Sequence, residues 1–107
     1  MAITNYQVGT GVGTAAYTAS ADTAVTVIHI TNKTDGDGTV DVYVVPSYDG
    51  STAPTSNYLV YSQLTIKARD TYIIDTEKMI LSNTDAIFIA APDSAAQFNA
   101  TISTIGL

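Results

Sequence analysis

Short runs of alternating apolar and polar residues, rich in β-branched side chains, recur along this chain. A two-residue period is typical of half-buried strands, because successive side chains of a strand point to opposite faces. No segment longer than one turn shows the period of about 3.6 residues that marks an amphipathic helix. The pattern predicts strands over residues 14–18, 24–32, 39–46, 58–66, 70–75, 85–91 and 97–105. About seven or eight short strands with regular turn signals predict an all-β fold, a compact antiparallel β-sandwich that is jelly-roll-like or immunoglobulin-like.

The segments between the strands carry turn residues. Residues 24–32 are apolar on both faces, which favours a central strand. They are followed by DGDG (residues 35–38), and Asp-Gly is the dipeptide that most strongly indicates a β-hairpin. Pro46 ends the next strand because it has no N–H to donate, and residues 47–57 form the longest loop. Residues 76–80 are predicted to form either a turn or a very short strand.

The chain length indicates one domain with one core, since the sequence has 107 residues and neither a repeat nor a linker. Residues 1–13 are rich in Thr and punctuated by Gly, so we expect an extended N-terminal arm. Residues 14–107 are expected to form the single β-sandwich domain.

The composition is poor in charge, with 46% hydrophobic and 13% charged residues. Charge is depleted at the cores of protein interfaces, so such a surface suits burial against another subunit. The net charge is −6, and the cations Lys33, Lys67, Arg69 and Lys78 form no stripe. We therefore expect neither a nucleic-acid partner nor a membrane partner.

Cysteine and signal sequences are both missing from the sequence. Neither disulfides nor thiolate chemistry is available without cysteine. The first residues lack the basic and apolar regions of a secretory signal, so we expect synthesis in a cytosol.

Three features of the sequence invite a metal, cofactor or catalytic interpretation. The single histidine, His29, lies inside a predicted strand without a motif that supplies an orienting carboxylate or a nucleophile. An EF-hand loop that began at Asp35 would need Gly at its sixth position and Glu at its twelfth, where this chain has Val40 and Pro46. The segment GTGVGT (residues 9–14) lacks the lysine of a nucleotide-binding loop and the required strand and helix around it. We therefore expect no cofactor, no metal site and no catalytic residue, although a weaker ion site at DGDG with Asp41 stays open.

Carboxylates are concentrated between residues 69 and 85. Asp70 and Asp75 flank a predicted strand, and roughly 16 Å separates their Cα atoms at about 3.3 Å per residue. A paired catalytic acid and base needs roughly 5–9.5 Å between its carboxyl groups. Glu77 with Lys78 suits a surface ion pair, and Asp70, Asp75 and Asp85 lie where a side chain can accept N–H groups of turns. The chain is therefore not expected to be an enzyme.

The seven tyrosines offer candidate contact residues. Tyr43, Tyr48, Tyr58 and Tyr61 surround the long loop, where they are suited to contact a protein, to stack on sugars or to pack half-buried. Together with apolar positions of the arm they make up the candidate interface: Ile3, Tyr6, Val8, Tyr43, Tyr48, Tyr58 and Tyr61.

Several segments resemble a known family. MAITNYQVGTG, AVTVIHITN, VDVYVVP, RDTYIIDTEKMIL and the terminal ATISTIGL are similar to segments of small virion structural proteins from tailed bacteriophages, especially phages of aquatic bacteria. The resemblance implies a structural protein of the virion, made and assembled in the host cytoplasm. Its implied partners are the major capsid protein or other virion proteins, and further copies of itself, with a trimer as one arrangement.

Three functions follow as hypotheses. The first is a capsid decoration or cement protein that binds the outer shell through its N-terminal arm and one face of the sandwich. The second is a module of the neck, tail or fibres, present in few copies. The third is a small carbohydrate-binding sandwich that uses the tyrosines around the long loop, among which Tyr48 and Tyr58 are the ones to substitute in a test.

Overall fold

The computed structural model describes residues 2–9, 15–51, 54–75, 79–92 and 97–107. The elements that these residues form are β1 (Ala2–Val8), β2 (Tyr17–Thr18), β3 (Thr23–Asn32), β4 (Gly38–Val45), the 3₁₀ helix η1 (Ser56–Tyr58), β5 (Leu59–Ile66), β6 (Thr71–Ile74), β7 (Met79–Leu81), β8 (Ala86–Ala90) and β9 (Phe98–Gly106). All seven predicted strands overlap a strand of the structure. Of the segment 76–80, the first three residues lie outside the described part, and the rest belongs to β7. No described helix is long and apolar enough to cross a membrane.

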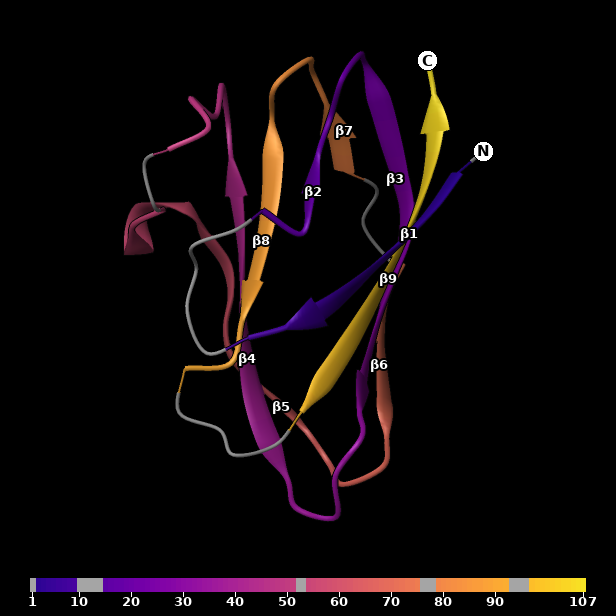
Figure 1. Cartoon of the computed structure of the whole chain (residues 1–107), viewed down its shortest axis with the longest axis vertical. Helices are drawn as coiled ribbons and strands as arrows, with labels where there is room; N and C mark the ends of the chain where they lie inside the picture. Colours follow the sequence, from indigo (N-terminus) through magenta and orange to yellow (C-terminus); the bar gives the residue numbers. More distant parts are fainter. Residues whose placement is uncertain (1, 10–14, 52–53, 76–78, 93–96) are drawn as a thin grey trace.

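The strands form two antiparallel sheets that pack against each other, so the predicted all-β sandwich is confirmed (Figure 1). The five-stranded sheet has the order β1-β9-β3-β6, and β7 pairs with the part of β3 that β6 does not reach. The four-stranded sheet has the order β2-β8-β4-β5. When β7 is left aside, this is the strand order of an eight-stranded jelly roll. The jelly-roll alternative therefore describes the topology.

Six of the eight connections between consecutive strands lead from one sheet to the other, and one of them corrects a prediction. DGDG (residues 35–38) joins β3 of the five-stranded sheet to β4 of the four-stranded sheet, so the predicted hairpin is wrong. Ile28 and Ile30 of β3 belong to the same buried core as Val40 and Val42 of β4. The two strands therefore face each other across the core instead of lying side by side.

The core between the sheets is built by every second residue of the inner strands. Its largest fully buried side chains include Phe98, Ile28, Ile30 and Ile102. Burial of one such side chain contributes about 1.5–3 kcal/mol, so these strands supply most of the stability of the fold.

Residues 2–8 differ from the extended arm that the sequence analysis expects. They form β1, an edge strand that pairs with β9 in unbroken register from Ala2↔Thr104 to Val8↔Phe98. Val8 is buried and Tyr6 packs against the core, so these two residues hold β1 on the sandwich. Residues 10–13 of the expected arm, and with them most of the GTGVGT segment, lie outside the described residues.

The loop after β4 covers the part of the outer face of the four-stranded sheet that surrounds Phe88. Along β8, Ile87 and Ile89 point into the main core, whereas Phe88 between them points to the opposite side. Phe88 is nevertheless fully buried, because Tyr43 and Tyr48 pack over it. The rings of Tyr48 and Phe88 are 5.0 Å apart with their planes at 83°. Tyr48 of the long polar loop therefore helps to close a second small core on this side.

Candidate interaction surface

The outer face of the five-stranded sheet consists of the residues that alternate with core residues. In β9, Phe98 and Ile102 are fully buried, and the intervening residues Asn99 and Thr101 point outward, as the sequence predicts. The antiparallel register aligns outward residues of neighbouring strands in rows. These rows are Gln7-Asn99-Thr31-Thr71, Asn5-Thr101-His29-Ile73, Ile3-Ser103-Val27 and Ile105-Ala24-Ile80.

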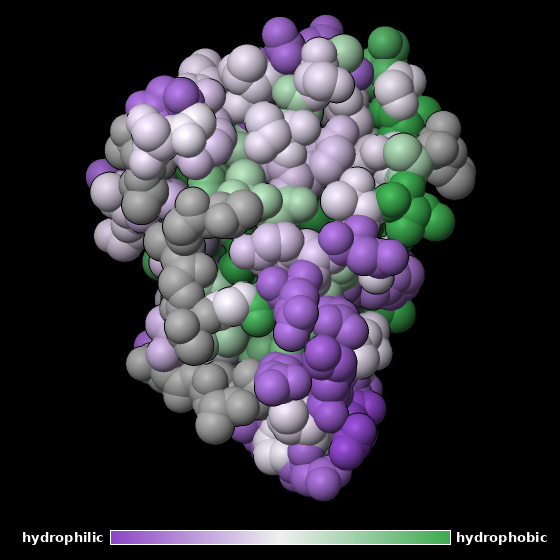
Figure 2. Space-filling view, in the orientation of Figure 1, coloured by the Kyte–Doolittle hydropathy of each residue, from purple (hydrophilic) through white to green (hydrophobic). Residues whose placement is uncertain are grey.

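This outer face has a polar half and an apolar half. The first two rows, apart from Ile73, supply amides, hydroxyls and one imidazole, and form the polar half. The apolar half comprises Ile3, Val27, Ile73, Ile80 and Ile105. Ile3 is 66% exposed and Ile80 is 64% exposed. Figure 2 shows hydrophobic residues gathered along the margin where the two ends of the chain lie in Figure 1.

The outer face carries no formal charge. Among the strand residues that the structure describes, Asp41 of β4 is the one Asp, Glu, Lys or Arg, and β4 belongs to the other sheet. The remaining described charges lie in the connections, where they surround the sheets. An uncharged centre with a charged rim is the arrangement found in protein–protein interfaces.

Side chains of the polar half are tied to one another across strands. The hydroxyls of Thr31 and Thr71 are 2.9 Å apart and share a hydrogen bond. The Thr101 hydroxyl donates to Oδ1 of Asn5 at 2.9 Å. These bonds fix the side chains of β1, β3, β6 and β9 in place, so the polar half is a preformed surface. His29 lies half-buried between the two bonds in the middle of the face.

The seven residues of the predicted interface do not form one surface. Ile3 belongs to the apolar half, whereas Val8 is buried and Tyr6 is half-buried against the core. Tyr61 also packs against the main core, and the remaining members, Tyr43, Tyr48 and Tyr58, belong to the cover of the four-stranded sheet or lie beside it. The sequence analysis missed Ile73, Ile80 and Ile105. A scan for uncharged outward positions in consecutive strands would have indicated them.

Tyr48 and Tyr58 come together at a hollow of about 180 Å³ on the loop that covers the four-stranded sheet. Its other lining residues include Pro46, Ser47, Asp49 and Pro54. Tyr43 lies nearby in the small core, where burial raises its pKa and the Asp41 carboxylate raises it further.

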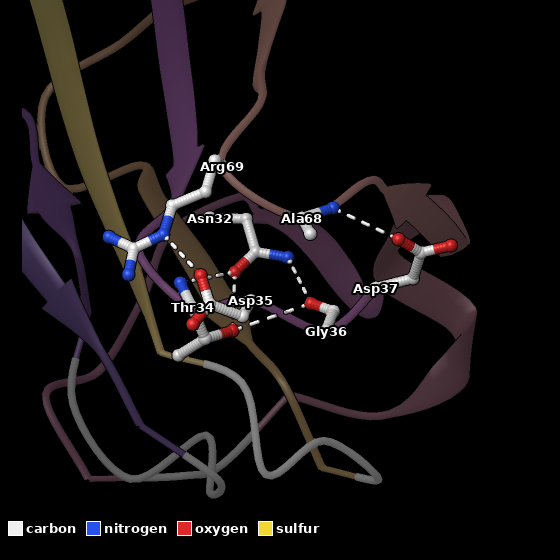
Figure 3. Close-up of polar contacts among 7 residues, drawn as sticks. All are labelled: Asn32, Thr34, Asp35, Gly36, Asp37, Ala68 and Arg69. Carbon is white, nitrogen blue, oxygen red and sulfur yellow. Dashed lines mark hydrogen bonds and ion pairs between the residues drawn. The ribbon is translucent and has the colours of Figure 1, made fainter.

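The acidic residues of DGDG bind groups of the protein itself (Figure 3). Oδ1 of Asp35 accepts a hydrogen bond from Nε of Arg69 at 2.9 Å, and Oδ1 of Asp37 accepts the N–H of Ala68 at 3.0 Å. Asp41 accepts the N–H of Gln63 at 2.7 Å. Among the described residues, no three His, Cys, Asp or Glu side chains gather as a metal site would require.

A buried amide holds the same connection together. Asn32, at the end of β3, is 1% exposed. Its amide donates to the carbonyls of Gly36 and Ile66 at 2.8 and 3.1 Å. Its Oδ1 accepts both the N–H and the hydroxyl of Thr34 (Figure 3). Asn32 therefore supplies the fixed point around which the chain passes from one sheet to the other.

The carboxylates at strand ends accept backbone N–H groups, as the sequence predicts for two of them. Asp70 accepts the N–H of Thr71 at 2.8 Å, and Asp85 accepts those of Ser47 and Ser82 at 2.9 Å each. Glu77 and Lys78, and with them the predicted surface ion pair, lie outside the described residues.

The chain was compared with protein-family models, curated proteins and solved structures. No protein-family model matches the chain, and no curated protein matches it. A chain from the structure of infectious bursal disease virus Gx strain is similar over 97% of this chain, with 11% sequence identity and a TM-score of 0.37. This chain spans 29% of that chain. A likeness of this size carries no conclusion about family or function.

Proposed function

We propose that this chain is a virion structural protein of a tailed bacteriophage and that it decorates the outer surface of the capsid. The resemblance of its segments to small phage virion proteins suggests the setting. The observation that carries the proposal is the uncharged outer face of the five-stranded sheet. Its apolar half exposes isoleucines, and its polar half holds prearranged amides and hydroxyls.

The two outer faces of the sandwich differ in how far their large apolar side chains are covered, and this difference supports the assignment. On the four-stranded sheet, the large outward side chain Phe88 is fully covered by Tyr43 of β4 and Tyr48 of the loop after β4. The described residues provide no such cover for the isoleucines of the apolar half, which stay 39–66% exposed. Contiguous exposed apolar surface marks sites of protein association. On a shell with many equivalent sites, contacts between neighbouring bound copies would add to the contacts that each copy makes with the shell.

β1, which ends the strand order of the five-stranded sheet, supplies a second element of attachment. Natural sheet edges are protected by charges, Pro, bulges or short length. β2 has two residues, and β5 has irregular register with β4, whereas β1 has seven uncharged residues without Pro and with unbroken pairing to β9. A strand of a shell protein or of a neighbouring copy can therefore extend the sheet at β1 by main-chain hydrogen bonds.

The proposal is tested by binding purified protein to capsids from which it has been removed or deleted. Ile73 of the apolar half and Val60 of β5 are both 50% exposed and β-branched, so Val60→Lys is a matched control for Ile73→Lys. A buried unpaired charge is strongly unfavourable at an interface. We expect Ile73→Lys and Ile73→Asp to lower affinity at least about tenfold and Val60→Lys to leave it unchanged. Normal occupancy with both Ile73 variants would contradict the proposed face.

Copy number distinguishes decoration from a role in the neck, tail or fibres. Quantitative mass spectrometry of purified virions is expected to find hundreds of copies per particle. A few copies would instead assign the chain to the neck, tail or fibres, and its absence from virions would overturn both roles.

A further inference from the structure

The hollow on the loop after β4 is a distinct feature of the side opposite the proposed attachment face. It has a volume of about 180 Å³ and is lined by Tyr48 and Tyr58, by Pro46 and Pro54, and by the polar residues Ser47 and Asp49. It adjoins the loop-built core over the outer face of the four-stranded sheet. A protein attached through the five-stranded sheet would therefore keep this hollow exposed to the surroundings.

The walls of the hollow are preformed. The ring of Tyr48 packs against buried Phe88, and the Tyr48 N–H donates to the carbonyl of Thr84 at 3.0 Å. The Ser47 N–H donates to Asp85 at 2.9 Å. Tyr58 ends the helix η1 and donates its N–H to the carbonyl of Thr55 at 3.0 Å. A ligand would thus meet walls that are already in place, which lowers the entropy that binding costs.

The chemistry of the walls restricts the ligand. The aromatic rings and prolines offer flat apolar surface. The Asp49 carboxylate is an acceptor whose Oδ1 also receives the Ser51 N–H at 2.9 Å. The hydroxyls of Ser47 and of the two tyrosines are both donors and acceptors. The lining contains no Lys, Arg or His. The hollow adjoins Asp85 through Ser47, and the chain carries a net charge of −6. The site therefore suits an uncharged ligand with an apolar face and several hydroxyl donors, and it disfavours phosphate and acidic sugars.

From this combination we infer that the hollow binds the ring of a neutral sugar. A pyranose presents C–H groups on one face, and these groups pack on an aromatic ring. The hydroxyls around its edge donate hydrogen bonds to a carboxylate. Roughly 300–1,000 Å³ is usual for sites of drug-sized ligands, so the smaller volume fits one ring.

Titration of ¹⁵N-labelled protein by NMR tests the inference, with glucose, galactose, mannose and N-acetylglucosamine as probes and sialic acid as the anionic comparison. We expect at least one neutral sugar to cause saturable shifts at residues 45–51 and 54–58, with a dissociation constant on the order of millimolar for so small a ligand. Sialic acid is expected to cause no such shifts. The absence of saturable shifts with all four neutral sugars would overturn the inference.

Matched variants tie binding to the hollow. Tyr58 and Tyr72 are both 38% exposed, but Tyr72 lies on β6 of the other sheet. Tyr58→Ala is expected to weaken binding about tenfold through loss of the stacking surface, Tyr58→Phe to preserve it, and Tyr72→Ala to leave it unchanged. Asp49→Asn, which retains an acceptor for the Ser51 N–H, gives a second test should Tyr58→Ala disturb the loop. Unchanged binding in both Tyr58→Ala and Asp49→Asn would overturn the assignment to this hollow.

Discussion

The Asp85 carboxylate accepts a hydrogen bond of 2.9 Å from the N–H of Ser47, which lies 38 positions earlier in the chain. Its second oxygen accepts the N–H of Ser82 at the same distance. Ser47 has a φ of 51°, in the left-handed region that non-glycine residues seldom adopt. The carboxylate therefore stabilises an unfavourable backbone conformation at the start of the loop that covers Phe88.

Removal of this carboxylate is expected to destabilise the protein. Asp85→Ala leaves two N–H groups without their charged acceptor, so the free energy of unfolding should fall by about 1–3 kcal/mol. Asp35→Ala is the control, because it removes an exposed ion pair with Arg69 that contributes at most about 1 kcal/mol. Urea denaturation measures both, and equal losses in the two variants would contradict the role given to Asp85.

Asn32 is expected to be among the most sensitive polar residues. Asn32→Ala removes an amide that makes four hydrogen bonds in a nearly water-free site. We expect a loss of about 2–4 kcal/mol. Asn99→Ala, on the outer face, should change stability by at most about 0.5 kcal/mol. A thermal or chemical unfolding midpoint of Asn32→Ala close to that of Asn99→Ala would show that the connection does not depend on the amide.

Tyr43 is expected to make stability fall at high pH. Burial, and to a lesser extent Asp41, raise the pKa of Tyr43 above the ordinary value of 10.0. The folded protein therefore keeps this proton to higher pH than the unfolded chain does. The stabilisation is complete below about pH 10 and is lost as the pH rises through the folded-state pKa. Denaturation between about pH 8 and pH 11 should show this decline, and Tyr43→Phe should reduce it.

Asp41→Asn separates the two causes of the Tyr43 shift. This variant removes the carboxylate charge but retains an acceptor for the Gln63 N–H. The pKa of Tyr43, followed by its NMR resonances, should fall in this variant yet stay above 10.0, because burial is the larger cause. A pKa that did not change would contradict the contribution of Asp41.

The Tyr48–Phe88 contact is expected to couple the loop to the sheet. In a double-mutant cycle with Tyr48→Ala and Phe88→Ala, we expect a coupling energy of about 0.5–1.5 kcal/mol. Tyr72→Ala paired with Phe88→Ala is the control, since Tyr72 lies on the other sheet and should show no coupling. A coupling near zero for Tyr48 would mean that the loop does not stabilise the small core.

Local sequence pattern predicted the strands well but not their pairing. The alternation of Phe98, Ala100 and Ile102 with polar residues predicts a strand at β9 whichever strands pair with it. The alternation reflects only which face of the strand is buried. Asp-Gly at residues 35–38 predicts a tight turn, yet it cannot reveal whether the next strand stays in the same sheet. That choice depends on the buried faces of β3 and β4, which meet across the core.

The candidate surface was predictable in kind but not in place. The low charge of the sequence favours an interface, and this feature is visible in the composition. The sequence does not show which of the two outer faces of the sandwich is the interface. The structure distinguishes them, because the loop after β4 covers Phe88 on the four-stranded sheet. The tyrosines near that loop therefore led to a predicted contact surface on the four-stranded sheet, where Tyr48 packs on the chain's own small core. The exposed isoleucines of the apolar half were missed.

The position of β9 between β1 and β3 affects how the protein is made. Of the described strands, β9 follows all the others in the chain, and it joins β1 to the rest of its sheet. Synthesis proceeds at roughly 5–20 residues per second, so β1 and β3 wait for several seconds without their common neighbour. This half of the sandwich closes only after β9 has left the ribosome, and nascent chains that emerge close together on one messenger RNA have time to exchange β1 and β3 before then.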